Sequence, residues 1–131
     1  MAKIDREVAQ NEFARWAAAW RIELDESELS EEDAESLNEQ RGKVVKAIEH
    51  GYLVVSEDGK QLVLDTDKGA VTFNEPTGAA YLAMDQHKNK NMASSFGFMG
   101  AMSGTPAKFW SSVRGADLKI AQAVTALFLA S

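Results

Sequence analysis

Residue types that commonly carry out chemistry are sparse in this chain of 131 residues. It contains no cysteine, which excludes disulfides, thiolate metal ligands and cysteine nucleophiles. Its two histidines, His50 and His87, have no second histidine or carboxylate three or four residues away, the spacing that binds a metal ion from one helix face. Asp65 and Asp67 share one face of a predicted strand but flank a turn, where acids usually bond to their own backbone. We expect neither a metal site nor an acid–base pair.

Serine and glycine patterns also fail to match known catalytic loops. Ser103 stands in Gly-Ala-Met-Ser-Gly, one position too late for the Gly-x-Ser-x-Gly turn that presents a nucleophile. Gly97, Gly100 and Gly104 lack the following Lys-Ser or Lys-Thr of a phosphate-binding loop. They are better explained as flexible points or as places where another backbone approaches closely. The sequence therefore predicts no enzyme and no cofactor, and it favours a binding protein.

Two apolar stripes are candidate protein-binding surfaces. Phe13, Trp16 and Trp20 recur at helical spacing, and aromatic anchors dominate many protein interfaces. Met92, Phe96 and Met99, near Gly97 and Gly100, would form a deformable surface suited to varied partners. Ordinary core packing is the alternative interpretation of both stripes. The candidate protein-binding residues are Phe13, Trp16, Trp20, Met92, Phe96, Met99, Phe109 and Trp110.

Charge is unevenly distributed along the chain. The net charge of −6 arises within residues 1–50, which hold seven basic against thirteen acidic residues. Nine acids occur between Glu23 and Glu39 without one Lys or Arg. Such a segment repels phosphate backbones, so we expect no nucleic acid partner. It is either a solvated connection with an exposed helix start or a surface for a basic protein.

Length and composition indicate one soluble folding unit. The hydrophobic fraction of 45% is typical of globular domains. No apolar stretch approaches the roughly 18 residues of a membrane span, and the opening residues are charged where a signal peptide would be apolar. We expect an intracellular protein that does not bind a membrane.

Residues 1–50 are predicted to form an acidic helical hairpin. Apolar residues recur at near-helical spacing from Ile4 to about Glu23, which predicts a first helix. A second helix is expected over 31–50, because Ser30 precedes it with a capping pattern and Gly51 suits its C-terminal end.

Residues 51–131 are predicted to form a β-meander followed by helices, in one domain with residues 1–50. Two or three short antiparallel strands are expected among the segments near 52–55, 62–64 and 71–73, with Asp58-Gly59 marking a hairpin. Helices are expected over 77–87, 92–103, 105–114 and 118–130, the last capped by Asp117 and so apolar that it must be buried in the core or in a partner. The predicted fold class is α+β, a mostly helical single domain with a small antiparallel β-hairpin or meander in its middle.

Three segments, taken in order, resemble the tail assembly chaperones of long-tailed bacteriophages or prophages of the Mu-like or lambda-like kind. They are VTFNEPTG at 71–78, MSGTPAKFW at 102–110 and DLKIAQAVTALF at 117–128. The resemblance spans 71–130, a little under half of the chain, and excludes the acidic aromatic N-terminal part.

The resemblance implies a non-enzymatic, mostly helical protein in the cytoplasm of a bacterial host. It would bind the tape-measure protein, and also a tail tube protein, would keep the tape measure soluble until the tube polymerises, and would self-associate. The resemblance assigns no catalytic role to any residue of this sequence. Two other hypotheses stay open: an acidic adaptor or inhibitor of a basic partner, and a minor structural tail protein.

Overall fold

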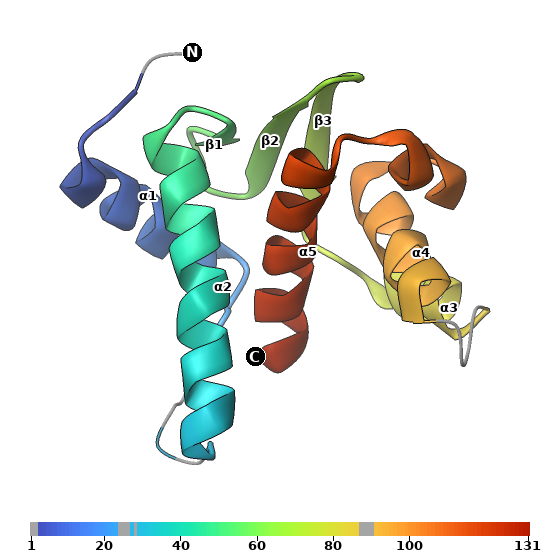
Figure 1. Ribbon diagram of the computed structural model, residues 1–131, viewed down its shortest axis with the longest axis horizontal. Coiled ribbons are helices and arrows are strands. Elements are labelled where there is room, and N and C mark those ends of the chain that lie inside the picture. The colour runs from blue at the N-terminus through green and yellow to red at the C-terminus, as the bar shows by residue number, and fades with distance from the viewer. Residues whose placement is uncertain (1–2, 24–26, 28, 87–90) are drawn as a thin grey trace.

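The structure of the protein is a computed structural model that describes residues 3–23, 27, 29–86 and 91–131. It confirms a mostly helical α+β fold with one three-stranded antiparallel sheet in the middle of the chain (Figure 1). His87 and the acids Asp25, Glu26 and Glu28 lie outside the described residues.

The N-terminal part consists of α1 (Arg6–Ala19) and α2 (Glu31–Glu49). The predicted cap of α2 is confirmed, because the Ser30 hydroxyl accepts a hydrogen bond from the Asp33 backbone N–H at 3.1 Å. Gly51 follows α2 with a φ of 80°, as its predicted role requires. The two helices pack against each other, but Figure 1 shows them crossing rather than lying side by side as a hairpin would.

The sheet is a meander of β1 (Leu53–Val55), β2 (Gln61–Thr66) and β3 (Gly69–Asn74) in that spatial order. Alternate residues are buried, so the cross-strand pairs Leu62–Phe73 and Leu64–Val71 form the face against the helices. The strands match the three predicted segments, with β2 and β3 extending further on both sides.

The predicted Asp58-Gly59 turn joins β1 to β2 and packs on α1. The Asp58 carboxylate accepts hydrogen bonds from the Ser56 hydroxyl at 2.7 Å and the Lys60 backbone N–H at 3.0 Å, which lower the pKa of Asp58. Gly59 has a φ of 78°, and Arg15 donates to the backbone carbonyl of Glu57 at 2.8 Å. The turn is therefore fixed both by its own hydrogen bonds and by α1.

The remaining elements are α3 (Gly78–Asp85), α4 (Asn91–Ser103), the 3₁₀ helix η2 (Ala107–Ser112) and α5 (Gly115–Ala130). Figure 1 shows α5 between α2 and α4, and both neighbours contact it. The apolar C-terminal helix is thus buried within this chain's own core, one of the two outcomes expected for it.

Three details of this region differ from the sequence prediction. Residues 107–112 form a 3₁₀ helix that Pro106 precedes, and Thr105 does not cap it because its hydroxyl bonds to Ser103 at 2.8 Å. Gly115 begins α5 rather than ending the element before it.

Asp117 also differs from its predicted capping role, because α5 begins two residues earlier. Its buried carboxylate accepts a hydrogen bond from the Asp67 backbone N–H at 3.1 Å. The Asp67 carboxylate in turn accepts from the Arg114 backbone N–H at 2.9 Å. Asp67 therefore bonds to the start of α5, not to its own turn, and the pair joins the β2–β3 turn to the helix.

One hydrophobic core includes residues from both predicted parts of the chain. Trp16 and Trp20 of α1 meet edge to face with ring centroids 5.0 Å apart, and Trp20 meets Phe128 of α5 at 6.0 Å. The Trp20 indole N–H donates to the backbone carbonyl of Lys60 at 2.8 Å. The aromatic residues of α1 therefore connect the first helix to the last one and to the sheet.

Gly100 is a close-contact position, one of the two roles predicted for it. A Cβ atom placed there would lie 2.7 Å from the carbonyl oxygen of Thr105, whereas one placed on Gly42 would meet nothing within 4 Å. We expect Gly100→Ala to lower the free energy of unfolding by about 1–3 kcal/mol through overpacking. Gly42→Ala should raise it by about 0.5–1 kcal/mol through helix propensity. Urea unfolding measures both, and equal stabilisation by the two substitutions would contradict the contact.

Burial of Trp16 predicts a large loss on truncation. Its side chain is fully buried, whereas Val8 on the same helix is 46% exposed. Trp16→Ala should lower the free energy of unfolding by about 3–5 kcal/mol because it leaves a cavity. Val8→Ala is the control and should change stability by less than about 0.5 kcal/mol. A Trp16→Ala protein as stable as the Val8 variant would show that Trp16 lies outside the core.

Candidate functional site

The structure buries half of the predicted protein-binding residues. Trp16, Met99 and Trp110 are fully buried and Trp20 is 2% exposed. These four are core residues, which corrects their assignment to a docking surface. Ring packing explains the burial of the three tryptophans, because Trp110 stacks on Phe73 with centroids 5.8 Å apart while Trp16 and Trp20 pack together. The spacing that suggested a docking stripe is the spacing of an inward helix face.

The other four predicted residues reach the surface to different extents. Met92 is 54% exposed, at the start of α4. Phe13, Phe96 and Phe109 are half-buried and pack against the core. These positions hold apolar side chains at a boundary with solvent, where a partner can reach them.

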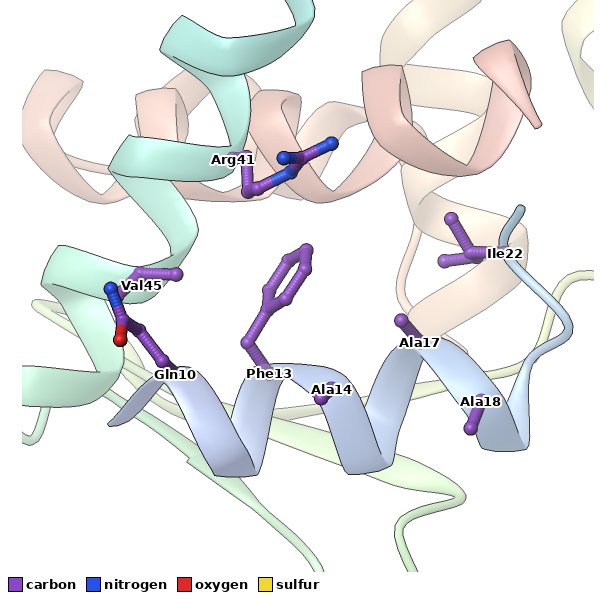
Figure 2. A pocket seen from close by; sticks show the side chains of 8 residues that line it. All are labelled: Gln10, Phe13, Ala14, Ala17, Ala18, Ile22, Arg41 and Val45. Carbon is purple, nitrogen blue, oxygen red and sulfur yellow. The ribbon is translucent and has the colours of Figure 1, made fainter. Parts of the chain in front are cut away.

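Phe13 lines an open groove of about 590 Å³ between α1, α2 and the segment that follows α1. Figure 2 shows its ring rising from α1, with Val45 of α2 on one side, Ile22 on the other and Arg41 of α2 above the ring. The ring also contacts Trp16 edge to face, with ring centroids 5.7 Å apart. The rest of the lining consists of Gln10, Ala14, Ala17 and Ala18.

The chemistry of this groove is that of apolar contact. Ala14 and Ala18 are exposed and small, so another chain can approach the α1 backbone closely. The groove between two helices suits an apolar helix face or a few large apolar side chains. Sequence reasoning identified Phe13 as a site residue but not Ile22 or Val45. The place of these two side chains in the groove depends on how α1 and α2 cross, which the sequence pattern does not show.

Three further apolar side chains are exposed on α3 and α4, two helices that pack against each other. Leu82 is 68% exposed, Met92 54% and Tyr81 45%, and Tyr81 contacts the buried Phe98 edge to face at 5.4 Å. The Met92 sulfur accepts a hydrogen bond from the Gln122 side-chain amide of α5 at 3.5 Å. We call these exposed side chains together the α3–α4 surface, of which Tyr81 and Leu82 lie on α3 and Met92 lies at the start of α4, against α5.

Sequence reasoning missed Tyr81 and Leu82, although a signal for them exists. The helix GAAYLAMD is short and apolar almost all round, yet only Ala80 within it is buried. A helix with more apolar positions than one face can bury must expose some of them.

The residues considered for chemistry have structural roles. The Ser103 hydroxyl donates to the Met99 carbonyl at 2.7 Å, a bond within its own helix. His50 stacks on Tyr52 with ring centroids 5.8 Å apart. Asp65 is exposed on the central strand β2. Among residues 3–23, 27, 29–86 and 91–131, no group of three or more potential metal ligands comes together.

Within the described chain, no helix is both long enough and apolar enough to cross a membrane. Comparison with known proteins found no matching family model, no matching curated protein and no matching solved structure.

Proposed function

We propose that this protein is a tail assembly chaperone of a long-tailed bacteriophage or prophage, acting in the cytoplasm of the bacterial host. It binds apolar helical segments of the tape-measure protein and keeps them soluble while the tail assembles. The observation that carries the proposal is the α3–α4 surface, where Tyr81, Leu82 and Met92 remain exposed on a folded chain.

The position of this surface in the sequence adds support. All three residues lie within 71–130, the part of the chain that resembles the chaperone family. Methionine and leucine side chains adapt to partners of different shape, as a protein that coats a long helical client requires. The Phe13 groove offers a second apolar contact outside that part. Two weak contacts on one molecule bind a long client more tightly than either alone.

A second candidate function is an acidic adaptor that binds a basic protein. The observation that favours it is the exposure of five acids in the first half of α2: Glu31, Glu32, Asp33, Glu35 and Glu39. Salt separates the two functions, because added salt weakens charge-driven binding steeply and leaves apolar burial largely unchanged.

Co-expression with helical fragments of the tape-measure protein tests the chaperone proposal. The unmodified chain should keep the fragments soluble and co-purify with them. The double variant Leu82→Glu/Met92→Glu should weaken binding by at least about tenfold, because it places charge on an apolar contact surface. Both positions are exposed, so we expect stability to change little.

Val54→Glu is the matched control, since Val54 is a 48% exposed apolar residue on β1. It should bind as the unmodified chain does. Ala14→Glu narrows the Phe13 groove without removing a core side chain, so it shows whether the groove also contributes to binding of the fragments. Two results would contradict the proposal. One is that the tape-measure fragments stay insoluble when co-expressed with the unmodified chain, and the other is that Leu82→Glu/Met92→Glu binds them as tightly as the Val54→Glu control.

A further inference from the structure

One exposed face of α2 has its charges sorted by sign. Glu32, Ser36, Glu39, Lys43, Lys46 and His50 follow one another at alternating spacings of four and three residues, which places them on one side of the helix. We call these six residues the α2 stripe. All are exposed or half-buried, whereas Val44 and Ile48 on the other side are buried. The acids occupy the first half of the stripe and the basic residues the second.

The basic half borders a hollow of about 580 Å³ between α2 and α5. Lys43, Lys46 and His50 line it from α2, and Lys119 and Ile120 line it from α5. In the part of the chain that the structure describes, the ion pairs are Arg6–Glu49 and Arg15–Glu12. The three lysines therefore form a concentrated, unneutralised positive surface on a protein whose net charge is −6.

The acidic half has the complementary charge and is accessible. Glu32 and Glu39 are exposed, and Glu35 stands beside them on the same side of α2. Figure 1 shows the first turns of α2 extending past the end of α5. Like charges crowded on one side of a helix repel one another, and a cationic surface relieves this repulsion.

We propose that two copies of this chain pair through their α2 stripes, antiparallel and related by a two-fold axis near residue 41. This arrangement places Glu39 opposite the second copy's Lys43, Ser36 opposite its Lys46, and Glu32 opposite its His50. The axis repeats every contact, so each acidic half meets a basic half. Parallel pairing would set like charges against each other and is disfavoured.

The pairing is expected to be weak and dependent on salt. Each exposed ion pair contributes little by itself, so stability must come from several acting together. Salt screens such contacts over roughly 10 Å or less. The dimer forms without any client protein, so its test is independent of the proposed chaperone function.

Sedimentation velocity of the pure chain over a range of concentrations tests the pairing. At about 20 mM salt we expect a monomer–dimer equilibrium with no species larger than two copies, and at about 500 mM salt a dissociation constant at least about tenfold higher. The charge reversals Lys43→Glu/Lys46→Glu and Glu32→Lys/Glu39→Lys should each weaken pairing by at least about tenfold. An equal mixture of the two variants should restore the dimer, because positions 32, 39, 43 and 46 are then all acidic in one chain and all basic in the other.

Lys68→Glu/Lys108→Glu is the control, since it makes the same change of charge at exposed positions off the stripe. It should pair as the unmodified chain does. Circular dichroism verifies that each variant is folded. If the charge-reversal variant Lys43→Glu/Lys46→Glu does not fold, Lys43→Gln/Lys46→Gln, which only removes the two charges, takes its place. A monomer at all concentrations, growth beyond two copies, equal weakening by the control, or a mixture that fails to restore the dimer would each overturn the proposal.

Discussion

The burial of α5 is the constraint on which the rest of this structure depends. Its residues are apolar over most of the circumference, so no single neighbour can remove them from water. The chain surrounds the helix with α2, β2 and α4. Phe128 makes ring contacts with Phe98 of α4 and with Trp20 at the end of α1. Because the last helix is the centre, the early and late parts of the sequence must fold together.

The same constraint decides which aromatic residues are left for binding. Trp16 and Trp20 join α1 to the core beside α5, and Trp110 closes the core over Phe73. These large rings are used for stability and are absent from the accessible surface. In the proposed function, recognition of another protein therefore falls to smaller side chains at the boundary with solvent, such as Phe13, Leu82 and Met92.

Local signals in the sequence predicted the elements well, and nonlocal contacts explain what they did not predict. The Ser30 cap and the left-handed Gly51 mark the ends of α2 by chemistry within a few residues, so the sequence alone suffices. By contrast, Asp67 and Asp117 are fifty positions apart in the hydrogen bond that joins them, and no turn rule anticipates it. A stripe such as Phe13, Trp16 and Trp20 has the same periodicity whether it faces a core or a partner, which is why two of its three members were wrongly assigned to a surface.

The geometry of α2 allows one helix to serve two surfaces. Val45 lines the Phe13 groove, and it follows Lys43 by two residues, which is a turn of about 200° around the helix. The groove and the α2 stripe therefore lie on nearly opposite sides of α2. Pairing through the stripe would leave the groove open, and it would not involve the exposed side chains of α3 and α4. A dimer of this kind would present two sets of apolar surfaces to one long client, and doubling the weak contacts in this way increases the avidity of a coat without requiring a tighter individual site.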